Sequence, residues 1–400
     1  MFRLLARASL PFLVDALRVA PRTDPDFGAA SWLTGVKPGT LLSAHVVDPV
    51  GLRTRLNPVI AHRIEYATTD SRSRSLTATG AVIRSLVPWR GPGPRPTVAF
   101  APSTQGVARR CDPSYSCTVG FAVRFRPWDA IAAYEQPAVS LLAAAGANVV
   151  LTDYPRDPED GVQLYSDHVS AARSLIDATR AAGCLGVGTQ ALGLWGYSQG
   201  GGAIGAWLEN PGYAPELQPL AAVVGAPPAD LKAVLGHVEG GLLAVVALYA
   251  VAGLVAWDEG IAEEIYSALS PAGARAVLDA GRVCAIGAVC NRPWANTQRW
   301  TASGVSMSEL LETLPQTSAR LDEMALGRGP ALKIPTRLWA AINDDVIPYG
   351  SVAALARTWD VELDTRRLPR IAGRTGANHI LPYFQHAPAD VQWLLANLGG

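Results

Sequence analysis

The segment LGLWGYSQGGGAIGAW, residues 192–207, constrains the fold more than any other part of the chain. Its first five residues, 192–196, form a short apolar run typical of strands that are buried on both faces of a sheet. Small residues follow Ser198, so the pattern predicts a strand, a sharp turn and a helix. Gly196 and Gly200 carry no side chain that would clash in such a turn. We therefore expect the serine to lie exposed at the carboxyl end of the strand, beside a helix N-terminus that favours negative charge.

Two further apolar runs, at residues 97–101 and 147–152, predict buried strands of the same sheet. Residues 162–182 carry apolar side chains at helical spacing, and a second helix is expected from Ser198 through Trp207. Strands and helices that alternate in this way indicate a parallel sheet with right-handed crossovers. Ahead of them, β-branched and polar residues alternate, which predicts antiparallel strands at 41–47, 59–68 and 76–87.

The alternation stops between residues 228 and 330, where Ala-, Gly- and Leu-rich sequence predicts helices without convincing strands. It resumes with a strand at 336–342, a helix at 351–359, a strand at 361–368 and a final helix at 388–398. An all-helical block inside an α/β pattern indicates an inserted cap. We expect an N-terminal extension at 1–40, an α/β core made of 41–227 and 331–400, and a helical cap at 228–330.

Residues 240–257 (GGLLAVVALYAVAGLVAW) contain no charge and have the threshold length of a membrane span. The stretch is rich in glycine and alanine, and acidic residues follow it at once in Asp258 and Glu259. No basic flank sets an orientation in a membrane. We therefore predict a buried or lid helix and no integral membrane span.

The chain has 34 basic and 34 acidic residues, so its net charge is zero. Proteins that bind nucleic acid over a wide surface carry a basic excess, and this composition excludes that class. The five cysteines form no C-x-x-C pair, which argues against a zinc ribbon or a thioredoxin-type site. We expect no metal and no organic cofactor.

A serine hydroxyl becomes a good nucleophile when a base accepts its proton and an acid orients that base. Three histidines follow Ser198 in the sequence. His237 lies in the predicted cap, and His386 stands just before the last predicted helix. His379 lies in the Gly-rich segment GRTGANHIL, expected to be a loop after the last strand. We favour His379 as the base because functional residues concentrate on such loops.

The acid is expected just after the strand at 336–342, in the sequence INDDVIPY. Asp344 and Asp345 are adjacent there, in a turn closed by Pro348. Only one of them can face the histidine, and the other is expected to make turn hydrogen bonds. The residues alone do not choose between the two.

Acyl transfer also needs two N–H donors for the oxyanion of the tetrahedral intermediate. One is expected from the residue after the nucleophile, Gln199, and one from the loop after the strand at 97–101. That loop reads PSTQG, so Ser103 or Thr104 is the natural second donor.

Together these residues resemble the secretory lipase family of α/β-hydrolases, the yeast lipase A type with many actinobacterial members. The similarity begins at PGTLLSAHVV near residue 38 and ends at NHILPYFQHAPADVQWLL, so it covers about 40–400. The most specific match is the combination of Gly-Tyr-Ser-Gln-Gly-Gly with Tyr-Ala-Pro-Glu-Leu. The resemblance implies an α/β-hydrolase core with a mainly parallel sheet, an inserted helical cap, and carboxylester hydrolase activity.

Carried over residue by residue, the family pattern makes Ser198 the nucleophile and His379 the base. It assigns the acid to the first aspartate of Asp-Asp-Val-Ile-Pro-Tyr, which is Asp344. Thr104 and Gln199 become the oxyanion donors.

The resemblance also implies a disulfide between the Cys111 position and a cap cysteine, and Cys284 is the preferred partner. Cys117, Cys184 and Cys290 match no part of the family pattern. We expect a secreted or cell-envelope protein. The apolar run at 10–17 is interrupted by proline and aspartate and is not a clear signal peptide.

The expected function is that of a serine lipase or esterase, which cleaves acylglycerols or other lipid esters through an acyl-enzyme on Ser198. Residues 240–257 are expected to line an acyl pocket, and transient contact with a lipid surface is a further expectation. Two alternatives stay open: an acyltransferase that uses the same triad, and a non-catalytic lipid-binding protein that keeps the fold.

Overall fold

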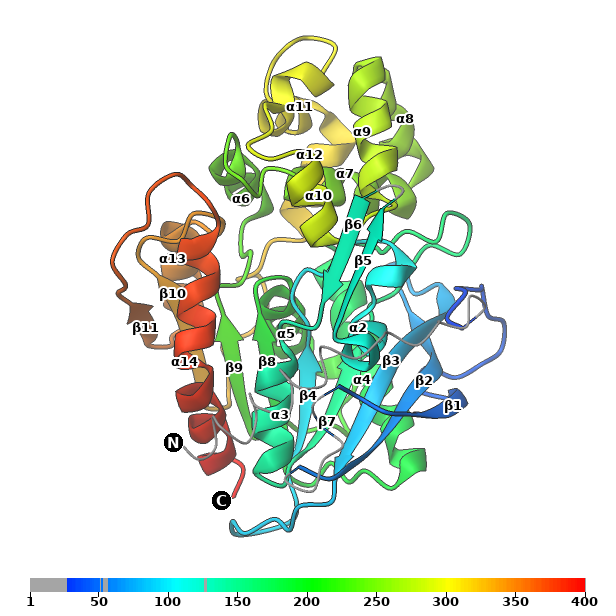
Figure 1. Ribbon diagram of the computed structural model, residues 1–400, viewed down its shortest axis with the longest axis vertical. Helices are drawn as coiled ribbons and strands as arrows, with labels where there is room; N and C mark the ends of the chain where they lie inside the picture. Colours follow the sequence, from blue (N-terminus) through cyan, green and yellow to red (C-terminus); the bar gives the residue numbers. More distant parts are fainter. Residues whose placement is uncertain (1–26, 51, 53–56, 126–127, 400) are drawn as a thin grey trace.

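The computed structural model describes residues 27–50, 52, 57–125 and 128–399. A nine-stranded sheet runs through it in the order β1-β2-β3-β7-β4-β8-β9-β10-β11 (Figure 1). The strands are β1 (Leu41–Val47), β2 (Val59–Thr69), β3 (Ser75–Ser85), β4 (Thr97–Ala101), β7 (Asn148–Thr152), β8 (Leu192–Tyr197), β9 (Ala221–Gly225), β10 (Thr336–Ala341) and β11 (Leu363–Arg366). The apolar run at 10–17 and most of the predicted N-terminal extension lie outside the described residues.

The sheet is antiparallel at one edge and parallel through the rest. β1, β2, β3 and β7 pair antiparallel, whereas β7, β4, β8, β9, β10 and β11 form parallel neighbours. The predicted α/β class and the mainly parallel sheet are therefore confirmed. Strand β9 was not predicted from the sequence. Its five residues, AAVVG, are small, stand between proline-rich segments and show no alternation of apolar and polar side chains.

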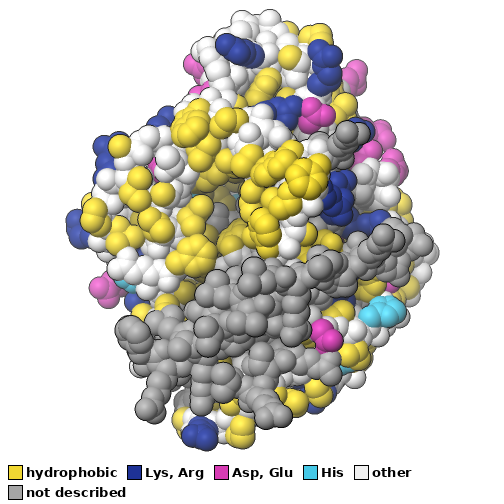
Figure 2. Space-filling model, in the orientation of Figure 1, with side chains coloured by type: hydrophobic (Ala, Val, Ile, Leu, Met, Phe, Trp, Pro, Cys, Tyr) yellow, Lys and Arg dark blue, Asp and Glu magenta, His cyan; other side chains and the backbone are white. Residues whose placement is uncertain are grey.

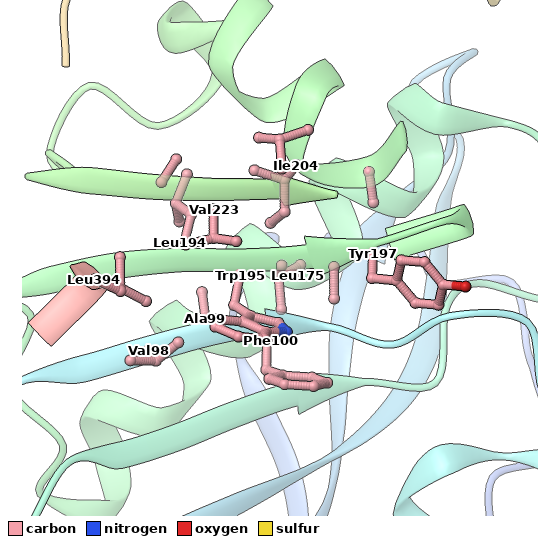
Figure 3. Packing of buried hydrophobic residues seen from close by; sticks show 14 of the residues in the cluster. Val98, Ala99, Phe100, Leu175, Leu194, Trp195, Tyr197, Ile204, Val223 and Leu394 are labelled. Carbon is pink, nitrogen blue, oxygen red and sulfur yellow. The ribbon is translucent and has the colours of Figure 1, made fainter. Parts of the chain in front are cut away.

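The central strands are buried along their whole length, as their apolar runs predict. Phe100 of β4 and Trp195 of β8 lie against each other (Figure 3), with 6.1 Å between their ring centroids. Both side chains are 1% exposed, so they fix the spacing of the two strands beneath the serine turn.

Helices cover both faces of the sheet (Figure 1). α4 (His168–Ala182) packs against α5 (Gln199–Glu209), and α3 (Gln136–Ala144) packs against α14 (Ala377–Ala396). The prediction for α4 was six residues too long at its start, because Asp167 caps the helix by accepting the N–H of Ser170.

The last helix, α14, begins at Ala377, and the prediction of a start at Pro388 was wrong. Proline is common in a first helical turn, which suggested that start. In the structure, Pro382 and Pro388 both lie inside the helix. Two other C-terminal predictions are confirmed to within two residues: helix α13 (Tyr349–Trp359) and strand β11.

Residues 231–323 contain helices and no strand element, and they lie beyond the carboxyl edge of the sheet (Figure 1). The α-helices are α6 (Leu231–Val238), α7 (Val246–Trp257), α8 (Glu259–Ala268), α9 (Pro271–Ala280), α10 (Ala285–Asn291), α11 (Met307–Thr313) and α12 (Pro315–Glu323). They share an apolar core of their own around Leu248, Tyr249 and Leu311. The division of the chain at 228 and 330 stays a prediction.

The charge-free segment at 240–257 contributes α7, a helix of 12 residues in which most side chains are buried. A helix of this length spans about 18 Å, well short of the roughly 30 Å hydrocarbon core of a bilayer. Across the described residues, no helix has both the length and the apolar character needed to cross a membrane.

A second, two-stranded sheet was not predicted. It is an antiparallel hairpin of β5 (Phe121–Phe125) and β6 (Trp128–Ala132), which follows helix α2 (Pro113–Val119). Cys111 lies just before α2 and forms a disulfide with Cys284, at the start of α10. This is the pair that the family resemblance implied, and it ties the loop after β4 to the helical block.

Candidate active site

Ser198 lies in the turn between β8 and α5, with φ of 55° and ψ of −121°. Non-glycine residues rarely adopt a positive φ, and such strain is often found at functional sites. A Cβ atom at Gly196 would lie 2.2 Å from the carbonyl oxygen of Gly200, and one at Gly200 would lie 2.0 Å from that of Ala101. Both glycines are therefore required by close backbone approach. The Ser198 N–H donates to Gly225 O at 2.9 Å and ties the turn to β9.

The structure brings Ser198, His379 and Asp344 together. The Ser198 Oγ lies 3.0 Å from Nε2 of His379, and Nδ1 of the same ring lies 2.7 Å from Oδ2 of Asp344. His379 is 4% exposed and Asp344 is 6% exposed, so both contacts are sheltered from water. This is the order serine, base, acid that proton transfer from a serine requires.

His379 stands in the first turn of α14, and its predicted loop position was wrong. The two glycines of GRTGANHIL suggested a flexible loop. Gly376, with φ of 78°, instead occupies the position immediately before the helix, and the helix begins at the next residue. His379 is thus held by a helix and not by a mobile loop.

The two adjacent aspartates have different partners. Asp344 Oδ1 accepts the backbone N–H groups of Val346 and Ile347 at 2.9 and 2.8 Å, which leaves Oδ2 to face His379. Asp345 Oδ2 accepts the N–H of Gly376 at 2.9 Å and lies 3.2 Å from the amide nitrogen of Asn378. Asp345 therefore holds the start of α14. The turn hydrogen bonds that were expected of the aspartate not facing the histidine are instead made by Asp344 itself, through Oδ1.

The other two histidines do not contact Ser198. His237, at the end of α6, lies with its Nε2 2.9 Å from the backbone oxygen of Asp344, so it contacts the acid turn from the helical block. His386 lies seven residues beyond His379 in the same helix, about two turns away.

Several residues that the sequence reading did not single out hold His379 in place. The hydroxyl of Tyr197 donates to the backbone oxygen of His379 at 2.9 Å, and the two rings stack 4.8 Å apart. Burial raises the pKa of Tyr197 well above its usual value, so this hydroxyl stays a neutral donor. Arg366 of β11 and Asp390 of α14 form a fully buried ion pair at 2.6 Å, which anchors α14 to the sheet.

Of the two candidate donors after β4, Ser103 is already engaged. Its backbone N–H donates to Oε2 of Glu135 at 2.6 Å. For Thr104, no hydrogen bond of the backbone N–H to another described residue is found. Gln199 is the first residue of α5, where a backbone N–H has no partner inside the helix. The N–H groups of Thr104 and Gln199 are therefore both left without a backbone partner among the described residues.

A cavity of about 390 Å³ opens beside the Ser198 hydroxyl and His379. Its wall is mostly apolar, and the segment at 240–257 contributes Leu242, Leu243, Val245, Val246, Tyr249 and Ala250. Figure 2 shows hydrophobic side chains gathered around a hollow in the face below the helical block. Among the described residues, no cluster of three His, Cys, Asp or Glu side chains could hold a metal ion.

Residues 130–400 match the family model described as "Secretory lipase". A secreted triacylglycerol lipase (LIP3) of Malassezia restricta is 28% identical over 348 residues, which cover 85% of this chain and 71% of that protein. A probable inactive lipase of Mycobacterium tuberculosis is 26% identical over 388 residues, which cover 95% of this chain and 83% of that protein. The crystal structure of Candida antarctica lipase A in its closed state superposes with a TM-score of 0.73 at 19% identity, over 92% of this chain and 86% of the other. This structural likeness confirms the α/β-hydrolase fold.

Proposed function

Because this chain belongs to the secretory lipase family of lipid ester hydrolases, we propose that Ser198 is the nucleophile with which it cleaves its ester substrate. The observation that carries the proposal is the continuous contact from the Ser198 hydroxyl through His379 to Asp344. The family membership and the Cys111–Cys284 disulfide also indicate a protein that is secreted into an oxidising environment.

In the first half of the reaction, Ser198 Oγ attacks the ester carbonyl and His379 Nε2 accepts the hydroxyl proton. Asp344 stabilises the imidazolium that forms. The tetrahedral oxyanion receives hydrogen bonds from the N–H groups of Thr104 and Gln199. His379 then protonates the alcohol as it leaves, and the acyl group stays on Ser198.

In the second half, a water molecule attacks the acyl-enzyme and His379 accepts its proton. The same oxyanion donors stabilise the second tetrahedral intermediate. The free acid leaves when His379 returns the proton to Ser198. All proton transfers occur at the one Nε2 atom that lies 3.0 Å from the serine oxygen.

The apolar cavity supports lipid esters as substrates. Each methylene that an acyl chain buries against such a wall contributes about 0.8 kcal/mol. We propose medium- to long-chain acyl groups, in acylglycerols such as those named for the Malassezia relative.

Hydrolysis of p-nitrophenyl esters from acetate to palmitate tests this function. We expect kcat/KM to rise several-fold for each two added carbons until the chain fills the cavity. A profile that is highest for acetate would contradict the lipid assignment. An enzyme with no turnover on any ester would support the non-catalytic alternative, which the inactive Mycobacterium relative makes worth testing.

We also propose transient docking on a lipid surface through exposed apolar residues beside the cavity. In the β5–β6 hairpin, Phe121, Val123 and Phe125 alternate along one strand and therefore share one face, with Trp128 opposite Phe125. Phe125 is 80% exposed and Phe121 is 49% exposed. Ile131, on the other face, packs in the core around the disulfide.

Helix α10 links the hairpin to the wall of the cavity. Helix α10 packs against β6, and its Ile286 and Val289 line the cavity. Across the cavity, Ile380 and Phe384 of α14 also line it and are 37% and 39% exposed. An apolar rim around the entrance of a lipid hydrolase fits a lipid–water interface, because the substrate is presented there.

Phe125→Ser is expected to lower activity on emulsified tributyrin by about tenfold, the cost of losing one buried aromatic at the interface. Activity on dissolved p-nitrophenyl acetate should hardly change, since that substrate needs no interface. Val46→Ser is the matched control, because Val46 is 69% exposed on β1 at the far edge of the sheet. Equal losses of activity on tributyrin in both variants, or no loss in either, would rule out docking through the exposed face of the hairpin.

A further inference from the structure

Glu135 is buried beside the loop that carries the proposed oxyanion donor. It lies directly before α3 and is 5% exposed. Its Oε2 accepts the Ser103 N–H at 2.6 Å. The next peptide unit carries the Thr104 N–H, so the bond to Glu135 restrains the backbone that sets the direction of that donor.

Tyr134 holds the same loop from the other side. Its hydroxyl donates to the backbone oxygen of Thr104 at 2.8 Å and lies 2.5 Å from Oγ of Ser103. Neither Tyr134 nor Glu135 touches the proposed triad. The two neighbouring residues thus restrain the loop immediately before and after the Thr104 N–H.

The surroundings of Glu135 favour a neutral carboxyl group. Its second oxygen, Oε1, is buried without a hydrogen-bond partner among the described residues. An ionised carboxylate in that position would be costly, because the loss of water outweighs what the neighbouring side chains of Ser103, Gln105 and Tyr383 offer it. Several titratable groups face Glu135, from its own turn and from the elements packed against that turn. They are Tyr134, Cys117 of α2, Tyr154 after β7, Tyr197 of β8 and Tyr383 of α14.

None of these facing groups is a cation. Burial raises the pKa of the Cys117 thiol to about 12 and the pKa of each of the four tyrosines well above its usual value. They therefore stay neutral and offer the carboxylate no opposite charge. Burial likewise raises the pKa of Glu135 itself to about 8.

We propose that Glu135 is a positioning residue, which as a neutral acid holds the oxyanion loop and which on losing its proton sets the alkaline limit of the reaction. This inference rests on the proposed function. The neutral carbonyl oxygen accepts the Ser103 N–H without adding charge to the site. The ionised form places a negative charge on the loop that must stabilise a developing oxyanion, and the two repel each other in a water-poor environment.

Two variants test the proposal with dissolved p-nitrophenyl butyrate. In the wild type, kcat/KM should fall above a pH of about 8, as Glu135 ionises. Glu135→Gln keeps an oxygen for the Ser103 N–H and cannot ionise, so this alkaline decline should disappear. Glu135→Leu removes the acceptor, and we expect kcat at pH 7 to fall by about 10- to 100-fold with little change in KM.

A stability measurement separates ionisation from catalysis. Because the folded protein keeps the Glu135 proton up to about pH 8 and the unfolded chain releases it near its usual pKa of 4.5, rising pH destabilises the wild type across that window. The melting temperature of Glu135→Gln relative to wild type should therefore rise between those pH values and level off above 8. This comparison needs no substrate.

The outcomes are distinguishable. An alkaline decline that persists in Glu135→Gln, or a melting-temperature difference that does not change with pH, would overturn the role of Glu135 while leaving Ser198 as the proposed nucleophile. Absence of turnover in the wild type would overturn the proposed function and this inference with it. A Glu135→Gln variant with a flat alkaline profile and a pH-dependent gain in melting temperature would support both.

Discussion

Replacing Ser198 with alanine is expected to lower kcat for p-nitrophenyl butyrate by about 10⁵- to 10⁶-fold. The variant loses the only oxygen placed 3.0 Å from His379 Nε2 in the described site, and the acyl-enzyme cannot form. Oxyanion donors and substrate binding leave a small residual rate. The measurement is kcat by product absorbance at pH 7.

The control for this variant is Ser73→Ala. Ser73 also has a positive φ, 63°, but it is exposed in the turn between β2 and β3. Its substitution also introduces alanine at a positive φ, without touching the cavity. Both variants should melt within a few degrees of wild type. Retention of more than about 1% of wild-type kcat by Ser198→Ala would exclude an acyl-enzyme at this residue.

Asp344→Asn is expected to lower kcat by about 10⁴-fold, whereas Asp345→Asn should lower it less than tenfold. The Asp344 carboxylate lies 2.7 Å from His379 Nδ1, where an amide would favour the wrong tautomer and could not stabilise the imidazolium. Asp345 accepts from Gly376 and Asn378 instead, so its loss should weaken the start of α14 and lower the melting temperature.

These neighbouring substitutions control for each other, because both remove one charge from the same turn. Activity and thermal unfolding are measured on both proteins. A larger loss of kcat in Asp345→Asn than in Asp344→Asn would mean that the acid has been assigned to the wrong aspartate.

The serine turn could be predicted from sequence because its constraints are local. Gly196 is required by its close approach to Gly200, four residues away, and the apolar run before Ser198 forms a strand buried on both faces. Gly200 is the exception, because the backbone that it approaches is Ala101 of the neighbouring strand β4. The strands at 97–101 and 336–342 were predictable for the same reason, because short, mostly apolar runs usually form strands buried within a sheet.

The features that sequence reasoning missed depend on contacts between distant parts of the chain. His379 was expected in a loop, because nothing near it in the sequence shows that Asp345 holds Gly376 and allows a helix to start there. Glu135 has no recognisable motif, and its meeting with Ser103 joins residues 32 positions apart. The hairpin at β5 and β6 was hidden because its exposed aromatic face does not follow the usual rule for burial.

The choice between Asp344 and Asp345 needed the family resemblance as well as the local sequence. Turn chemistry alone allowed either residue to face the histidine. The family resemblance favoured Asp344, and in the structure the N–H groups of Val346 and Ile347 turn that carboxylate toward His379.

Covalent trapping tests directly whether Ser198 is the nucleophile. The wild type is treated with a fluorophosphonate, and the labelled chain is digested and mapped by mass spectrometry, with Ser198→Ala treated in parallel. We expect one label per chain, on the peptide that contains Ser198, and no label in the variant. An enzyme that hydrolyses esters but carries its label on another residue, or carries none, would contradict this role of Ser198.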